Sequence, residues 1–264
     1  MQNKLRKSRR PILKINKVIF LVIITFIFSC SEAPKIEIRP FERIVLAELF
    51  TWARCPYCPY AAQALDSLAK EFQDSLVVIA YHRRVGGDTL SPQYVENRKS
   101  FYYESGGEPA VFFDGTGPIR TSDPAQNYVT YKSHIINHRN QKSSLYIRLE
   151  PQIQNNIGVI RTVIVPTDTI YPANLSLFFI VCEDSVKFFL PGAPDSIFNN
   201  VMRVMIPDEN GIACTLALND SLIKTVQLPL NQSWNKNKLT VISFVQNLTN
   251  KEILQCTFKK LIQE

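Results

Sequence analysis

An α/β domain followed by an all-β sandwich domain is the fold that the sequence predicts, divided between residues 43–142 and residues 143–264. Three observations support this division. A strand-like apolar run leads into a helix-like run through Cys55 and Cys58, which are separated by two residues. Strand and helix patterns then alternate up to residue 142. Beyond it the helix signals fade, and short β-rich runs are separated by Pro, Asn, Asp and Gly.

The first region should contain its elements in the order β-α-β-α-β-β-α. Its strand candidates are short apolar runs, and its helix candidates space apolar residues at helical intervals. In chain order the predicted elements are a strand over 44–50, a helix over 60–72, a strand over 76–82, a helix over 92–103, a strand and hairpin turn within 108–115, and a helix over 124–141.

The two closely spaced cysteines predict redox chemistry. Thiols at this spacing form a small disulfide loop and exchange it with other thiols, and the attacking species is a thiolate. A helix N-terminus supplies unpaired N–H groups and the positive end of a dipole, which lower the pKa of a nearby thiol. Arg54 adds a cation beside Cys55. We therefore expect Cys55 to attack and Cys58, placed one turn into the helix and more buried, to resolve.

Two other interpretations of the cysteine pair stay open. The pair could be half of a zinc site, but Cys182, Cys214 and Cys256 are isolated and far away in sequence, so no second ligand pair is visible. It could also be a structural disulfide on a fold that has lost its redox role. We expect no metal, and thiol exchange of this kind requires no bound cofactor.

The second region contains seven strand candidates, which favour an antiparallel sandwich of the immunoglobulin-like kind. Cys256 and Cys214 alternate with apolar neighbours and are expected to be small buried side chains. At most one disulfide can form among the three remaining cysteines. The strand candidates are residues 145–150, 157–165, 175–181, 201–206, 222–228, 239–246 and 253–259.

The first 29 residues account for the basic character of the chain, whose formal net charge is +7. They hold seven Lys and Arg and no acid, which leaves 23 basic and 23 acidic residues in the remainder, so nucleic acid is not an expected partner. The apolar run 18–28 is short for a membrane span and fits the apolar part of a signal peptide. An uncleaved N-terminal anchor is the alternative.

The residues before Cys30, Ile27-Phe28-Ser29, resemble a lipobox, in which the cysteine becomes the acylated first residue. We expect a signal peptide over 1–29, a lipidated tether over 30–42, and attachment to a membrane without spanning it. Ser31 after Cys30, by resemblance to lipoprotein sorting patterns, favours the outer membrane, on its periplasmic or surface face.

The cysteine pair at a strand-to-helix junction resembles the thioredoxin superfamily, and a second segment supports the resemblance. Glu108-Pro109, followed by an aliphatic strand, looks like the family's cis-proline segment. The resemblance implies that Pro109 is cis and packs against the cysteine pair. It also implies that Glu108, Trp52 and Tyr57 contact the substrate, with the Glu108 carboxylate favouring basic substrates.

The whole arrangement resembles the outer membrane protein 28-related family of thioredoxin-like bacterial lipoproteins. The matching stretches are residues 48–51 with Cys55 and Cys58, residues 200–203 and residues 241–247. Members of the superfamily commonly keep a buried acid behind the cysteine pair, which shuttles a proton for the resolving thiol. Glu48 matches that position approximately, and a solvated or salt-bridged Glu48 is the alternative.

Three histidines are weaker candidates for a functional role. His82 ends a predicted strand on the same side of the sheet as the loop that carries the cysteine pair. It would either assist proton transfer there or be an ordinary polar residue at a strand end. His134 and His138 stand four apart on a predicted helix, but no third ligand lies at a matching interval, which favours surface histidines.

The sequence thus predicts a membrane-anchored thiol–disulfide oxidoreductase of the cell envelope whose partners are protein thiols and disulfides. The competing prediction, from another class, is a surface interaction lipoprotein whose thioredoxin-like domain is a non-catalytic scaffold.

Overall fold

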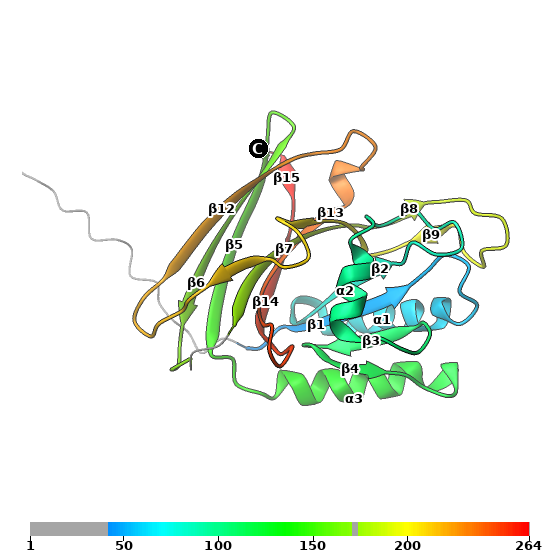
Figure 1. Cartoon of the computed structure of the whole chain (residues 1–264), viewed down its shortest axis with the longest axis horizontal. Helices are drawn as coiled ribbons and strands as arrows, with labels where there is room; N and C mark the ends of the chain where they lie inside the picture. Colours follow the sequence, from blue (N-terminus) through cyan, green and yellow to red (C-terminus); the bar gives the residue numbers. More distant parts are fainter. Residues whose placement is uncertain (1–41, 171–173, 264) are drawn as a thin grey trace, which may run out of the picture. The chain divides into compact units, whose positions relative to one another are not determined.

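The computed structural model describes residues 42–170 and 174–263. The predicted signal peptide, Cys30 and nearly all of the predicted tether lie outside these residues. The elements of the first region follow the predicted order (Figure 1). They are β1 (Val45–Thr51), α1 (Cys58–Phe72), the 3-10 helix η1 (Gln73–Ser75), β2 (Leu76–His82), α2 (Val95–Tyr102), β3 (Ala110–Phe113), β4 (Thr116–Ile119), the 3-10 helix η2 (Pro124–Gln126) and α3 (Asn127–Arg139).

Strand β1 is buried along its whole length and organises the first region. It pairs in parallel with β2, from Val45 opposite Leu76 to Thr51 opposite His82, and antiparallel with β3, which in turn pairs with β4. A parallel pair requires a crossover connection, and α1 supplies it. Within the first region the strand order in the sheet is β2-β1-β3-β4.

Alternate side chains of β1 enter two different cores, because successive residues of a strand point to opposite faces. Leu46 and Phe50 pack in a core that includes Tyr102 of α2. Ala47 and Leu49 pack in a second core formed with α1 and α3. The sheet therefore separates α2 from α1 and α3. This separation decides which side chains can reach the cysteines at the start of α1.

All seven strands predicted for the second region are present. In chain order the elements are β5 (Leu145–Gln154), β6 (Ile157–Pro166), β7 (Leu175–Glu183), β8 (Val186–Lys187), β9 (Ile197–Phe198), β10 (Val201–Ile206), β11 (Ile212–Cys214), β12 (Leu222–Pro229), the 3-10 helix η3 (Lys236–Lys238), β13 (Leu239–Asn247), β14 (Ile253–Lys260) and β15 (Ile262–Gln263).

One sheet runs through both regions, in the order β14-β13-β7-β10-β2-β1-β3-β4, with β11 also paired to β7. The junction lies between β10 and β2, where Val201 is opposite Ala80 in parallel register. The Ala80 N–H donates to the Asn200 carbonyl at 2.8 Å. The described residues, 42–170 and 174–263, accordingly belong to one compact unit. The boundary after residue 142 is a change of secondary structure inside that unit.

The second region does form a sandwich, but one of its layers is the shared sheet. The other layer has the order β12-β6-β5-β15, in which β15 is parallel to β5. The expected separate immunoglobulin-like domain is not confirmed. Strand β7 explains why, because all nine of its residues are buried. Phe178 packs in the core of α2, whereas Phe179 packs against β5 and β6.

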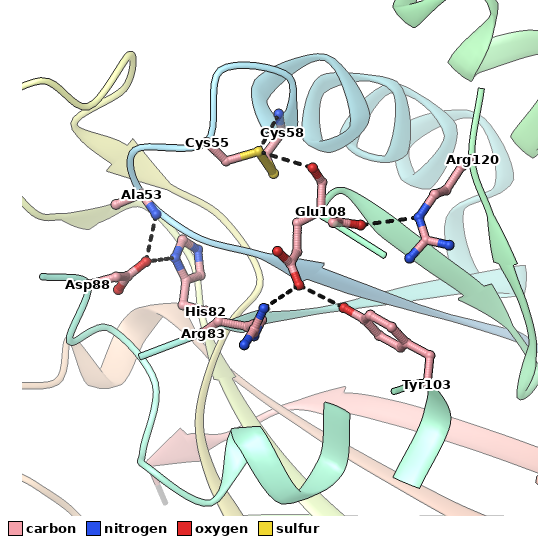
Figure 2. The surroundings of a disulfide bond; sticks show 10 residues. Ala53, Cys55, Cys58, His82, Arg83, Asp88, Tyr103, Glu108 and Arg120 are labelled. Atoms are coloured by element: carbon pink, nitrogen blue, oxygen red, sulfur yellow. Dashed lines mark hydrogen bonds and ion pairs between the residues drawn. A yellow bond between two sulfur atoms is a disulfide. The ribbon is translucent and has the colours of Figure 1, made fainter. Parts of the chain in front are cut away.

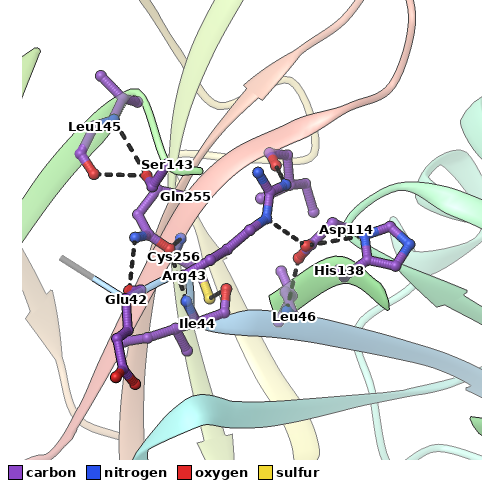
Figure 3. A network of polar contacts seen from close by, with 11 residues as sticks. Glu42, Arg43, Ile44, Leu46, Asp114, His138, Ser143, Leu145, Gln255 and Cys256 are labelled. Carbon is purple, nitrogen blue, oxygen red and sulfur yellow. Dashed lines mark hydrogen bonds and ion pairs between the residues drawn. The ribbon is translucent and has the colours of Figure 1, made fainter. Parts of the chain in front are cut away.

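A polar network holds the start of β1 to three distant segments (Figure 3). The Arg43 guanidinium donates to Asp114 Oδ2 at 2.9 Å and to the Ile253 carbonyl at 2.6 Å. Asp114 also accepts the Leu46 N–H at 2.8 Å and lies 3.2 Å from His138 Nδ1 of α3. Because a Cβ on the neighbouring Gly115 would lie 1.8 Å from the Lys251 carbonyl oxygen, this turn requires glycine.

In the described part of the chain, Cys182, Cys214 and Cys256 are free thiols. Cys182 and Cys256 are buried, as expected for Cys256, and Cys214 is half-buried. Within residues 42–170 and 174–263, no helix has both the length and the apolar character needed to cross a bilayer.

Candidate functional site

Cys55 and Cys58 form a disulfide at the junction between β1 and α1, with their Cα atoms 5.4 Å apart. A turn places Cys55 just before the helix, because its N–H donates to the Trp52 carbonyl at 3.0 Å. Cys58 is the first residue of α1, and its N–H donates to Cys55 Sγ at 3.1 Å. Pro59 fits the first turn because its missing N–H has no helical acceptor there.

The two cysteines are equally buried, with exposed fractions of 2% for Cys55 and 3% for Cys58. The expectation that Cys58 is the more buried of the pair was therefore wrong. Cys58 starts the helix instead of lying one turn inside it, so both sulfur atoms sit at the N-terminal end of α1. Arg54 is exposed, and its Nε donates to the Pro191 carbonyl at 2.8 Å.

The Glu108–Pro109 peptide bond is cis, as the resemblance implied. Pro109 directly precedes β3, and the Glu108 carbonyl oxygen lies 3.6 Å from Cys55 Sγ. The backbone before the proline thus contacts the sulfur that is expected to attack.

The carboxylate of Glu108 points away from the disulfide and is already paired (Figure 2). Arg83 Nη1 donates to it at 2.7 Å and the Tyr103 hydroxyl at 2.8 Å. Burial and this carboxylate raise the pKa of Tyr103. Because Arg83 and Tyr103 occupy the carboxylate, a preference for basic substrates no longer follows from Glu108.

The structure does not bring Glu48 together with the cysteines. Glu48 has Leu46 and Phe50 as its alternating neighbours, so it faces α2, whereas Cys58 begins the helix on the other face of the sheet. Its carboxylate is fully buried and accepts from Arg98 Nη2 at 2.7 Å. Glu48 is therefore salt-bridged, which was the alternative to a proton-shuttling role.

His82 does lie on the side of the cysteines, in a chain of contacts that reaches Ala53, in the loop before Cys55 (Figure 2). Its Nδ1 is 2.8 Å from Asp88 Oδ2, and the same oxygen accepts the Ala53 N–H at 2.7 Å. The other carboxylate oxygen accepts the Leu90 N–H at 2.9 Å. The ring of Phe198 meets the imidazole edge-on at 5.0 Å between centroids.

A cavity of about 180 Å³ lies beside the disulfide. Both cysteines line it, together with Trp52, His82 and Asp66. Part of its wall comes from the second region: the hairpin segment, defined as residues 184–200 and containing β8 and β9, contributes Asp195 and residues 197–200.

Asp66 of α1 holds the hairpin segment in place. The side-chain amides of Asn199 and Asn200 donate to its two carboxylate oxygens at 2.8 Å and 3.0 Å. Burial raises the pKa of Asp66, and these amides partly oppose the change. The second region is therefore part of the candidate site, which the sequence did not predict.

A second cavity, of about 430 Å³, lies on the side of the cis proline. Tyr57, Glu108 and Pro109 line it, together with Gly106 and Arg120. The predicted substrate-contacting residues are thus split, with Tyr57 and Glu108 at this cavity and Trp52 at the smaller one.

The two helical histidines have separate environments. His134 stacks on Phe113 at 5.7 Å between centroids, and burial and the neighbouring His138 lower its pKa. His138 faces Asp114. In the part of the chain that the structure describes, no group of three or more His, Cys, Asp or Glu side chains could hold a metal ion.

No protein-family model matches the chain, and no curated protein sequence matches it. Solved structures do resemble it. HBP35 of Porphyromonas gingivalis is 18% identical, with a TM-score of 0.69 over 84% of this chain and 76% of that one. A crystal structure of a protein from Agrobacterium tumefaciens is 15% identical, with a TM-score of 0.51 over 83% and 95%. At these identities the likeness concerns the fold alone.

A domain of the outer membrane lipoprotein Omp28 from Porphyromonas gingivalis is also among these neighbours, at 9% identity over 46% of this chain and 91% of that one. Its TM-score of 0.35 is too low to carry an argument. The fold and the site define a thioredoxin-like scaffold that carries a Cys-x-x-Cys disulfide, extended by a β-rich region that closes one side of the site.

Proposed function

We propose that this protein is a thiol–disulfide oxidoreductase. One observation carries the proposal: the Cys55–Cys58 disulfide lies at the start of α1, and the carbonyl that precedes the cis Pro109 contacts Cys55 Sγ. A reactive pair at a helix N-terminus and an adjacent backbone segment are what thiol exchange with an extended polypeptide requires.

The reaction of the reduced protein proceeds in two exchanges. The Cys55 thiolate attacks a substrate disulfide, which forms a mixed disulfide and releases one substrate thiolate. Cys58 then loses its proton and attacks Cys55 Sγ. The Cys55–Cys58 disulfide forms, the second substrate thiolate leaves, and the substrate has gained the two electrons that the protein dithiol has lost. The reverse sequence oxidises a substrate dithiol.

Substrate binding is assigned to the cavity lined by Tyr57 and Pro109. An extended substrate segment would pair with the backbone of Glu108, and Trp52 would contact it from the other side of the disulfide. Main-chain pairing makes recognition permissive for sequence.

The test is reduction of a protein disulfide, such as that of insulin, by the reduced protein with dithiothreitol as electron donor. We expect turnover above the dithiothreitol background, abolished by Cys55→Ser and unchanged by Cys214→Ser. In cells, Cys58→Ser should trap substrates as mixed disulfides on Cys55. Turnover no faster than the background, together with no trapped species, would reject the assignment.

A second candidate is an interaction lipoprotein that uses the thioredoxin-like region as a scaffold. The observation in its favour is the burial of both cysteines, at 2% and 3% exposure, beside a hairpin segment whose Phe189 is 83% exposed. A scaffold would keep its disulfide in dithiothreitol concentrations that reduce a catalytic pair, and would show no turnover.

We also propose a location at the outer membrane of the cell envelope through acyl chains on Cys30. The support is the basic segment, the apolar run and the lipobox-like residues that precede Cys30. Mass spectrometry of the native N-terminus tests it, and an unmodified Cys30 inside an uncleaved chain would refute it.

A further inference from the structure

The resolving step requires a group that accepts the proton of Cys58. Cys58 must become a thiolate before it attacks Cys55 Sγ. Its exposed fraction is 3%, so contact with bulk water is minimal. Glu48, the acid expected for this role, lies on the other face of the sheet. We therefore expect the acceptor to be a group that lines the same cavity as Cys58.

The cavity of about 180 Å³ contains three titratable side chains besides the cysteines: His82, Asp66 and Asp195. They come from β2, from α1 and from the hairpin segment, which are packed around it. Asp66 is already hydrogen-bonded, because Asn199 and Asn200 donate to its two carboxylate oxygens. Asp195, on the hairpin segment, is half-exposed. His82 is 2% exposed and is the buried candidate.

Asp88 holds the His82 imidazole in the tautomer that can accept a proton. It accepts the Ala53 and Leu90 N–H groups, so it acts as an acceptor toward the imidazole as well. This assigns the proton of the neutral ring to Nδ1 and leaves the lone pair on Nε2. The ring of Phe198 packs against the imidazole and fixes its plane.

We propose that His82 accepts the proton of Cys58 during the resolving step, with Asp88 as the residue that positions it. The inference rests on the proposed oxidoreductase function. The cavity is large enough for water molecules, one of which carries the proton from Cys58 Sγ to His82 Nε2. The S–H bond breaks, an N–H bond forms, and the thiolate attacks Cys55 Sγ. The imidazolium then returns the proton to the departing substrate thiolate through the same water.

The test separates the two exchanges by mixing the reduced protein with dithiobis(nitrobenzoate), a chromogenic aromatic disulfide. Attack by Cys55 releases one coloured thiolate, and resolution by Cys58 releases a second. His82→Asn is the informative variant, because its amide can still donate to Asp88. We expect the first phase to be unchanged and the second to slow by about 100-fold at neutral pH, within the usual range for general-base catalysis. Raising the pH should restore it, because the Cys58 thiolate then forms without an acceptor.

Asp195→Asn is the matched control, since it removes the charge of another carboxylate that lines the cavity, and both phases should stay within about twofold of wild type. Asp88→Asn should slow the second phase by about tenfold, within the range of a lost positioning contact. A Cys55→Ser/Cys58→Ser variant reports background colour from the other thiols, and thermal unfolding checks that each variant is folded. If His82→Asn disturbs folding, His82→Gln replaces it.

The outcomes distinguish the two proposals. A wild-type protein that releases no second thiolate contradicts the oxidoreductase assignment itself. A wild-type protein with both phases, and a folded His82→Asn variant whose second phase is as fast at every pH, overturns the role of His82 and leaves the oxidoreductase assignment intact.

Discussion

Arg98 and Glu48 form a fully buried ion pair, 2.7 Å from Nη2 to Oε1, where the two regions of the chain meet. Arg98 belongs to α2 and Glu48 to β1, and Arg98 Nη1 also donates to Gln246 of β13 at 2.8 Å. Burial by itself lowers the pKa of Arg98, but Glu48 offsets this, so the net pKa lies above its ordinary value. The guanidinium lies over the rings of Phe178 and Phe244 from the second region, at 5.0 Å and 5.5 Å.

Arg98→Met should lower the free energy of unfolding by about 3–5 kcal/mol, because it leaves the Glu48 carboxylate buried without its cation. Replacing both residues, Arg98→Met with Glu48→Leu, should cost less than Arg98→Met alone. Denaturation by urea measures both. A double variant that is less stable than the single one would contradict this account of the pair.

Glu108→Gln and Arg83→Met should change the reactivity of Cys55 in opposite directions. Glu108→Gln removes a negative charge and leaves the cation of Arg83, which favours the thiolate, whereas Arg83→Met leaves the carboxylate without its cation and with only the Tyr103 hydroxyl of the two named donors. The rate of Cys55 alkylation at neutral pH, measured in a Cys58→Ser background, should rise about threefold in the first case and fall about threefold in the second. Equal changes in both variants would show that the pair does not act on Cys55.

The three free cysteines should resist alkylation in the folded protein. Burial raises the pKa of Cys214 to about 11 and raises the pKa of Cys182 and Cys256 well above the ordinary value. A higher thiol pKa means less thiolate at neutral pH, so labelling of Cys214 should accelerate as the pH rises toward 11. Labelling of Cys182 and Cys256 should follow global unfolding, which mass spectrometry against urea concentration can test. Labelling of either before unfolding would show that its core opens locally.

Residues 43–142 should not fold cooperatively by themselves. The core on the α2 face includes Phe178, Ile180 and Phe244 from the second region, and their removal would expose Phe50 and Tyr102. At about 25 cal/mol per Å² of apolar surface, the loss of several buried aromatic contacts exceeds the stability of a domain of this size. A sharp thermal transition of the fragment, seen by circular dichroism, would refute this.

The sequence was most informative where local chemistry determines the structure. The order of elements up to residue 142, the seven later strands and the disulfide were predictable, because each depends on neighbours within a few residues. The cis bond before Pro109 followed from the resemblance to the thioredoxin superfamily. The shared sheet was not predictable, since an apolar run such as β7 does not reveal what covers its two faces.

The candidate site shows the same limit. Glu48 has the right residue type at roughly the right spacing, yet a shift of one position along a strand moves a side chain to the other face. His82 was noticed as a polar strand end, but its partner Asp88 lies in a loop with no motif, and the hairpin segment comes from more than 100 residues later in the chain. An acid six residues after a strand-ending histidine was the one available signal.

The junction between β10 and β2 sets an order of events during synthesis. A chain made from its N-terminus presents β1, β2 and the cysteine pair long before β10 and the hairpin segment exist. Until then the outer edge of β2 offers unpaired N–H and C=O groups, and the apolar face toward α2 is half covered. The cysteine pair therefore lacks the cavity wall that the hairpin segment provides until residue 200 has been made. The enclosure of the disulfide thus depends on a segment that is made more than 100 residues after the cysteines.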